Sequence, residues 1–320
     1  MKKSYLKDIL SKFGVPVFFI LLLVIVQLLN SDIGILRASN LLLVFQQASV
    51  FILLALGLSV VMIGGETDLS IAGAMGFTGA VFVTAIRAEY GLWPAVALTI
   101  LASLFIGVVN GILVGRFRYP SFLVTLATMF FTLGLQNAFT NGLTIWIEDR
   151  TITRLDETLI MGIPIFMFLS IVVAVIYYFL VYFTRWGFNI RVVGENSNAA
   201  DEVGLGTKYY KFLIFVVAAL FYGIAGVIEP IRVSGSVIYS GQAMLLPAMT
   251  ACFLGSTMFV PGKVNVAGTF FAAFLLSLII NVLTLLGIRF SIITLFQGLL
   301  LLGAVALSNI HNRSVKQNLI

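Results

Sequence analysis

The 320-residue sequence contains few charged residues, one cysteine and one histidine. Charged residues make up 10% of the chain, whereas soluble domains carry about 25%. Cys252 alone cannot form a disulfide framework, and together with His311 it cannot supply a ligand cluster for a metal. We therefore expect no disulfide, no metal site and no cofactor, and we expect Cys252 to be a packed residue of an apolar stretch.

The sequence also lacks the short motifs of catalysis and of nucleotide binding. It has no H-E-x-x-H, no nucleophile elbow and no paired acids. The stretch from Gly255 to Gly262-Lys263 comes nearest to a phosphate-binding loop. It has one residue too many between its glycines and lacks the Ser or Thr that would hold magnesium. We therefore expect a protein that is not an enzyme and has no ATP site of its own.

Hydrophobic residues, in contrast, make up 60% of the chain and run in unbroken stretches longer than about 18 residues. In a bilayer such stretches must be helices, because every backbone N–H and C=O has to be satisfied within the segment. We predict an all-α membrane protein, a polytopic bundle of about ten transmembrane helices that forms one domain over residues 1–320. The predicted spans lie near 15–29, 41–63, 71–88, 94–114, 121–139, 163–183, 211–231, 245–260, 264–284 and 290–309.

The basic residues indicate the orientation of this bundle. Ten spans place both termini on one side, where thirteen of the nineteen Lys and Arg residues, including every lysine, then lie. By the positive-inside rule that side is the cytoplasm, so the net charge of +6 needs no nucleic-acid partner. No small-residue cleavage site follows the run 15–29, which we interpret as the first span and not as a signal peptide.

A weak internal similarity predicts an inverted repeat. Asn110-Gly-Ile-Leu followed by Phe-Leu-Val-Thr125 resembles Asn281-Val-Leu-Thr followed by Ser-Ile-Ile-Thr294. The first pair of spans would turn in the cytoplasm and the second outside. Such pairs are common where a transport path lies between two halves of a membrane protein.

The most informative polar residues interrupt two apolar runs at Gly64-Gly65-Glu66-Thr67-Asp68-Leu69-Ser70. Carboxylates at membrane depth are costly unless they face a partner, water or a polar cavity. Flanking glycines permit an unwound backbone, as in the broken helices of transporters. The segment is therefore either an intramembrane break on a solute path or a cytoplasmic hairpin in which Asp68 caps the next helix with support from Ser70. The two interpretations are compatible.

A second informative stretch covers about residues 184–211, the longest predicted cytoplasmic segment. Asn198 can cap a short helix through Ala199, Ala200 and Glu202, and Gly204 or Gly206 can end it. A short amphipathic helix outside the membrane suits docking into a groove of a soluble partner. A simple connecting loop is the alternative.

Several amides also lie in apolar runs, among them Gln46, Gln136 and Asn281, and we expect them to hydrogen-bond between helices. Glu229-Pro230, close to Arg232, predicts an ion pair or cap near the outer face.

Together these residues resemble the permease subunits of bacterial ABC importers for ribose, other monosaccharides and autoinducer-2-type molecules. The resemblance covers nearly the whole chain. It is carried by three motifs, which are Gly64-Gly65-x-x-Asp68-Leu69-Ser70, then Asn110-Gly111-x-Leu113 with Pro120-x-Phe122 and Thr125-Leu126-x-Thr128, and finally Gly194-x-Asn196-x-x-Ala199-Ala200-x-x-x-Gly204.

The resemblance implies a multi-pass permease in the bacterial plasma (inner) membrane that pairs with itself or with a paralogue. Cytoplasmic ATP-binding subunits would dock on the coupling residues Gly194, Glu195, Asn196, Ala199, Ala200, Glu202 and Gly204. An extracytoplasmic solute-binding protein would deliver a small polar, sugar-like solute to a path lined by Glu66, Thr67, Asp68, Ser70 and Asn110. Glu66 stands where the family usually has an apolar residue, so it could alter the choice of solute.

Three alternatives stay open. The solute could be a nucleoside or a branched-chain amino acid. The chain could be an ion-coupled secondary transporter in which Glu66, Asp68 or Glu229 takes up protons or sodium. A membrane-embedded enzyme is the third alternative, for which the sequence offers no catalytic constellation.

Overall fold

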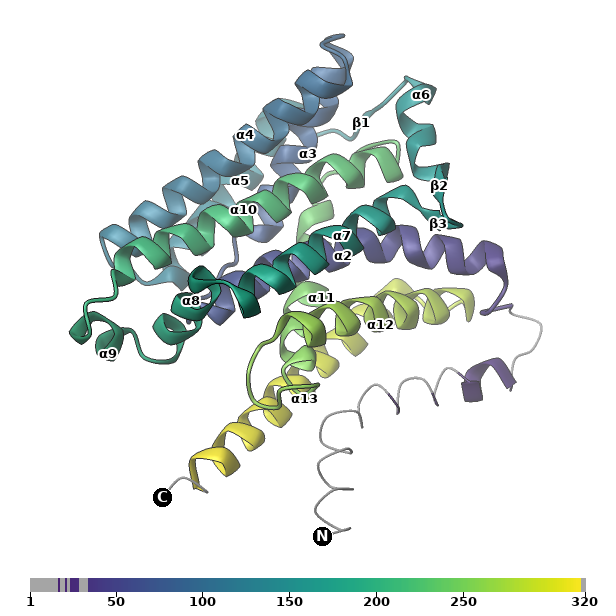
Figure 1. Ribbon diagram of the computed structural model, residues 1–320. Helices are drawn as coiled ribbons and strands as arrows, with labels where there is room; N and C mark the ends of the chain where they lie inside the picture. Colours follow the sequence, from purple (N-terminus) through teal and green to yellow (C-terminus); the bar gives the residue numbers. More distant parts are fainter. Residues whose placement is uncertain (1–16, 18–20, 22–23, 29–33, 318–320) are drawn as a thin grey trace.

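The computed structural model describes residues 17, 21, 24–28 and 34–317. The predicted first span, 15–29, and the basic N-terminal lysines therefore lie largely outside the described residues. Figure 1 shows the described chain as a bundle of helices with short connections. Its longer helices are α2 (Ala38–Ile63), α3 (Ile71–Arg87), α4 (Leu92–Gly111), α5 (Ser121–Thr140), α7 (Ile165–Phe183), α10 (Thr207–Arg232), α11 (Ser240–Gly255), α12 (Val266–Leu285) and α13 (Phe290–Gln317).

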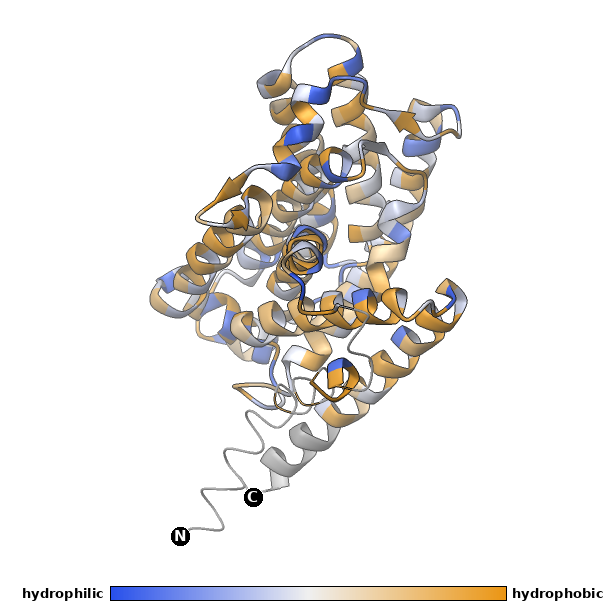
Figure 2. Ribbon diagram, turned by 90° about the vertical axis from the view of Figure 1, so that its right-hand side faces the viewer, coloured by the Kyte–Doolittle hydropathy of each residue, from blue (hydrophilic) through white to orange (hydrophobic). Residues whose placement is uncertain are grey.

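The all-α prediction is confirmed, since the described strands have only two residues each. Within the described residues, seven helical segments are long and apolar enough to cross a membrane, and α3 is a shorter apolar helix. The helices are mostly hydrophobic, and hydrophilic residues gather mainly in their connections (Figure 2). The chain is therefore a polytopic membrane protein, while the count of ten spans stays a prediction.

The predicted span 245–260 is wrong in position, because α11 covers Ser240–Gly255. The polar start Ser240-Gly241-Gln242 reads as a loop in a hydropathy scan, yet it is helical. The reason is a close approach between backbones. A Cβ added at Gly241 would lie 1.9 Å from the carbonyl oxygen of Ala72, so the first turn of α11 packs directly on α3.

The most deeply buried long helices are α2, α10 and α12, whose most apolar windows are 61%, 67% and 61% buried, and the shorter α3 is buried along most of its length, whereas the corresponding window of α13 is 17% buried. Small residues let the helices approach closely, as is usual in membranes, where apolar side chains gain little from leaving lipid. A Cβ at Gly107 of α4 would lie 2.5 Å from Ala219 Cβ of α10. The most buried helices therefore occupy the centre, and α13 lies at the edge.

The two ends of the bundle carry different connections (Figure 1). One end holds α6 (Arg150–Thr153), the 3-10 turn η3 (Arg154–Glu157), and the strand pairs β1 (Ile145–Trp146) with β4 (Gly235–Ser236) and β2 (Leu159–Ile160) with β3 (Ile163–Pro164). The other end holds α8 (Arg185–Glu195) and α9 (Ser197–Glu202). We call them the α6 end and the α9 end.

The predicted inverted repeat receives no support from hydrogen bonding. Asn281 of α12 accepts a hydrogen bond from Asn40 of α2 at 3.0 Å, whereas Asn110 of α4 bonds to Ser70 and Thr128. The two asparagines thus have partners of different kinds, and the repeat stays a prediction.

Candidate functional site

Residues 64–70, which we call the connector, join α2 to α3 without a regular helical turn. α2 ends in a Schellman motif, in which the amide of Glu66 donates to Val61 O and that of Gly65 to Met62 O. Gly65 has φ +80°, a conformation that favours glycine. The chain therefore leaves α2 abruptly and turns back into the bundle.

Asp68 is the centre of a buried hydrogen-bond network. Its Oδ1 accepts from the amide of Ser70 at 2.8 Å and from the hydroxyl of Ser70 at 2.5 Å, and its Oδ2 accepts from the hydroxyl of Tyr222 at 3.1 Å. The Ser70 hydroxyl in turn accepts from Asn110 Nδ2 at 3.0 Å, and Asn110 Oδ1 accepts from Thr128 at 2.6 Å. Asp68, Ser70 and Asn110 are each 1% exposed. Their side-chain oxygen and nitrogen atoms are hydrogen-bonded to one another, to Tyr222 and to Thr128, as buried polar groups require.

The depth of Asp68 within the bundle shows where the connector lies. Tyr222 belongs to α10, which begins at Thr207, and residues 207–222 cover about 22 Å of helix axis at about 1.5 Å per residue. Asp68 is thus buried well inside the length of α10, while it also bonds the amide of the residue before α3. The structure shows a turn between α2 and α3 and a carboxylate inside the bundle. The predicted capping of α3 by Asp68 is wrong, because the N-cap position is Ser70, which has a helical backbone and receives no side-chain cap bond. The intramembrane break and the cytoplasmic hairpin both stay predictions.

Glu66 and Thr67 lie apart from this network. Glu66 forms an ion pair with Lys211 of α10 at 2.6 Å. The amide of Thr67 donates to the Ser121 hydroxyl at the start of α5, at 3.2 Å. The structure therefore brings Asp68, Ser70 and Asn110 together and directs Glu66 towards the α9 end of the bundle.

One cavity borders the connector, and a second borders the hydrogen-bond network around Asp68. One, of about 310 Å³, is lined by Glu66 and Lys211 together with Arg118, Ser197 and Asn198. The other, of about 460 Å³, is an apolar groove between α3, α4 and α5 that Thr128 also lines. Thr128 is half-buried, so the buried network reaches a groove at this residue.

The predicted coupling segment, 184–211, contains two short helices, α8 and α9, instead of one, and its last residues already belong to α10. α9 is capped by Asn196, whose side chain accepts from the amide of Ala199 at 3.0 Å, so the predicted cap at Asn198 is wrong. Asn196 precedes the first helical residue with an extended backbone, which is the geometry of an N-cap, and Asn198 lies within the helix. Gly204 ends the turn at φ +79°, as predicted.

α8 was not predicted, because Gly187 and Gly194 interrupt an otherwise weak pattern. Its buried residues are Gly187, Ile190 and Val193, which share one face at helical spacing. In α9, Ala200 is 1% exposed and packs inwards, whereas Ala199 and Glu202 are exposed. The outer face of α9 is therefore accessible.

Two ion pairs connect this segment to other parts of the bundle. Asp201 bonds to Arg118 at 2.8 Å and to the hydroxyl of Thr207, and Glu195 pairs with Lys263. The hydrogen bond from Thr207, together with the Arg118 guanidinium, holds the pKa of Asp201 below its usual range. The pairs Asp201–Arg118 and Glu195–Lys263 are largely exposed, so each contributes little to stability.

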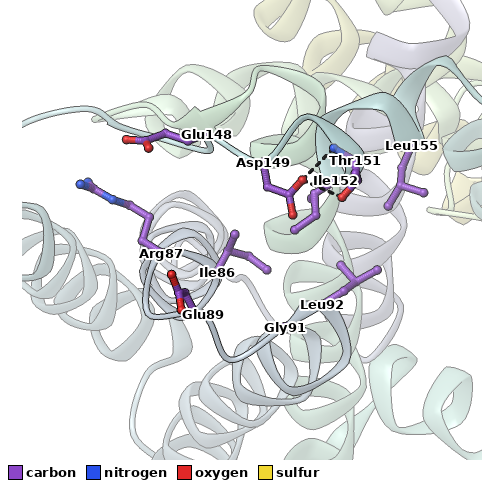
Figure 3. A pocket seen from close by; sticks show the side chains of 10 residues that line it. All are labelled: Ile86, Arg87, Glu89, Gly91, Leu92, Glu148, Asp149, Thr151, Ile152 and Leu155. Atoms are coloured by element: carbon purple, nitrogen blue, oxygen red, sulfur yellow. Dashed lines mark hydrogen bonds between the residues drawn. The ribbon is translucent and has the colours of Figure 1, made fainter.

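At the α6 end lies a cavity of about 710 Å³ between the start of α4, the end of α3 and residues 148–155. Figure 3 shows Arg87, Glu89, Glu148 and Asp149 around it. Hydrogen bonds from the hydroxyl and amide of Thr151 hold the pKa of Asp149 below its usual range. This end therefore presents a charged hollow of mixed sign.

The predicted ion pair of Glu229 is confirmed. Arg232 donates to both carboxylate oxygens of Glu229 at 2.9 Å. Asp156 lies nearby in η3, is 9% exposed, and has an Oδ1 without a hydrogen-bond partner. Burial raises the pKa of Asp156 to about 6, with Glu229 and Glu157 adding to the rise and Arg232 opposing it.

The sequence indicated Asp68, Ser70 and Asn110 as site residues, but it did not indicate the residues of α10 that bind to the connector. Tyr222 and Lys211 lie in α10, far along the chain from the connector, and nothing in their local pattern links them to Asp68 or Glu66. Thr128 belongs to a motif that the sequence singled out, but its bond to Asn110 could not be foreseen.

Comparison with known proteins gives consistent matches. Residues 40–305 match the family described as branched-chain amino acid transport system / permease component. The chain is 26% identical to the ribose import permease protein RbsC of Haemophilus influenzae, over 91% of this chain and 90% of that protein. It is 32% identical to the L-arabinose ABC transporter permease protein AraH of Azospirillum brasilense, over 75% and 71%. It is 26% identical to the autoinducer 2 import system permease protein LsrC of Salmonella paratyphi B, over 90% and 83%.

Proposed function

Since the chain belongs to the branched-chain amino acid transport system / permease component family, we propose that it is the membrane-spanning permease of an ATP-driven importer for a small polar, sugar-like solute. The observation that carries the proposal is the family match over residues 40–305, which includes the connector, the whole of α9 and every helix that packs on them. Permeases of this kind move a solute and catalyse no reaction themselves.

The sugar-like solute is favoured over a branched-chain amino acid by the named relatives. Their names refer to ribose, L-arabinose and autoinducer 2, and each relative aligns over 75% or more of this chain. A secondary transporter, in which Glu66, Asp68 or Glu229 would take up an ion, is disfavoured by the same relatives, whose names describe two import permease proteins and an ABC transporter permease protein.

In the proposed arrangement ten spans place both termini and the α9 end in the cytoplasm. Two ATP-binding subunits dock on the exposed face of α9, and ATP hydrolysis takes place in these subunits. A solute-binding protein delivers its solute at the α6 end, where the charged hollow lies. The permease pairs with a second copy or a paralogue, and its apolar helices face lipid.

The solute path in this proposal is lined by Glu66, Thr67, Asp68, Ser70 and Asn110. In the structure the network around Asp68 is closed, since each of its polar groups has a partner within the chain. Transport therefore requires that the connector shifts relative to α4 or α10, so that a solute hydroxyl can replace one of these partners. Such a shift is the local form of alternating access.

Co-purification tests the proposal. The tagged chain is solubilised in mild detergent from its native membranes, and the chains that co-purify are identified. Recovery of an ATP-hydrolysing subunit in about equal amount with a solute-binding protein supports the proposal. Recovery of the chain without any nucleotide-binding subunit, while the solubilised chain stays folded, would count against it.

A further inference from the structure

The connector touches α8 through a contact that side chains would block. A Cβ added at Gly65 would lie 2.9 Å from the carbonyl oxygen of Gly194, and one added at Gly194 would lie 2.0 Å from Ile63 O. The end of α8 and the start of the connector are therefore in direct backbone contact. Because only Asn196 separates α8 from α9, a displacement of α9 is passed directly to the end of α8 and so to its contact with the connector.

A second contact joins the connector to the first turns of α10. The Glu66–Lys211 ion pair measures 2.6 Å, and its side chains are 14% and 22% exposed. Lys211 follows Thr207 by one turn, and the Thr207 hydroxyl donates to Asp201 of α9. The pair is much less exposed than Arg118–Asp201 and Lys263–Glu195, so water and salt screen it less.

The inner end of the connector is fixed to other helices. The amide of Leu69 donates to Thr125 of α5 at 3.0 Å, Asn110 of α4 donates to Ser70, and Tyr222 of α10 donates to Asp68. One short segment thus contacts the α8–α9 pair at its outer end and three helices of the bundle at its inner end. A movement of its outer end has to change the geometry around Asp68.

We infer that the connector carries the movement of α9 into the buried network, and that the Glu66–Lys211 ion pair couples the two. The inference rests on the proposed function, in which nucleotide turnover in a docked subunit moves α9. Lys211 is then a positioning residue, which touches neither solute nor nucleotide. Glu66 stands at the cytoplasmic end of the proposed solute path, where Lys211 engages its carboxylate.

The test uses a cysteine reporter in the connector. Cys252 is the sole native cysteine and is fully buried, and the half-buried Thr67 is replaced by cysteine. The co-purified complex is placed in lipid nanodiscs, and the rate at which a maleimide labels T67C is measured with and without ATP and vanadate. Lys211→Gln is compared with Lys263→Gln, which removes the same charge from an exposed pair.

We expect nucleotide to change the labelling rate about fivefold in the parent complex and in Lys263→Gln, the change that about 1 kcal/mol produces in an equilibrium constant. In Lys211→Gln the change should fall below about twofold, and the exchange Glu66→Lys with Lys211→Glu should restore it.

An undiminished response in Lys211→Gln would overturn the inference. It would also be overturned by a parent complex that hydrolyses ATP without any change at T67C, or by an assembled charge exchange that does not restore the response. These failures differ from that of the proposed function, in which no ATP-hydrolysing subunit co-purifies.

Discussion

Replacing Asp68 with alanine removes the acceptor of three buried hydrogen bonds, two from Ser70 and one from Tyr222. Leaving a buried donor without an acceptor costs about 1 to 3 kcal/mol. The Ser70 hydroxyl can rotate to another acceptor, whereas the Ser70 amide and the Tyr222 hydroxyl keep their positions. Two buried donors without an acceptor correspond to a loss of about 4 kcal/mol in the free energy of unfolding.

The assay is thermal unfolding of the detergent-solubilised protein. At about 2 °C per kcal/mol, Asp68→Ala should lower Tm by about 8 °C. Tyr222→Phe removes one bond to the carboxylate and should lower Tm by roughly 4 °C. Tyr177→Phe is the matched control, because Tyr177 is equally buried and its hydroxyl lies 3.3 Å from the neutral Ser59 hydroxyl.

Tyr177→Phe should lower Tm by about half as much as Tyr222→Phe, since a hydrogen bond to a carboxylate is stronger than one between neutral hydroxyls. Asp68→Ala unfolding within about 2 °C of the parent protein would refute the reasoning, and so would equal losses in the two tyrosine variants.

Three further predictions concern the two ends of the bundle. Because the pKa of Asp156 is raised to about 6, its contribution to stability is complete below about pH 4 and falls by about 2 to 3 kcal/mol as the pH rises through 6. Amide exchange of residues 145–164, corrected for its intrinsic rate, should thus be better protected at about pH 5 than at about pH 7.5, and Asp156→Asn should remove this difference. Asn196→Ala removes the cap of α9 at a cost of about 1 kcal/mol and should weaken capture of the ATP-binding subunit in a pull-down, whereas Asn196→Asp should keep it. Ala199→Glu places a charge on the exposed face of α9 and should abolish capture without lowering Tm, and intact capture would exclude α9 as the docking surface.

The sequence was sufficient for the helices because each apolar run is long and uninterrupted, as in α2 and α12. It failed where polarity and helix disagree, as at the start of α11, where Gly241 packs on Ala72 and keeps Ser240 and Gln242 helical. Hydropathy measures transfer to lipid and is blind to such contacts between backbones.

The candidate site shows the same division. The motif around Asp68 and the position of Asn110 were visible in the sequence, because carboxylates and amides in apolar runs are costly unless partnered. Their shared partner Ser70 was in view, but Tyr222 and Lys211 belong to α10, more than a hundred residues later in the chain. The ion pair between Glu66 and Lys211 therefore depends on how α10 packs against the connector, which the local sequence does not show. This packing gives Glu66 and Asp68 different partners, although the sequence places both acids in one motif.

The energy source of uptake tests the central claim most directly. The complex and its solute-binding protein are reconstituted in liposomes, and entry of the solute recovered from that binding protein is measured with ATP on the α9 side. We predict that uptake requires ATP and persists when ionophores collapse the proton and sodium gradients. Uptake by the chain alone that follows an ion gradient and ignores ATP would contradict the account.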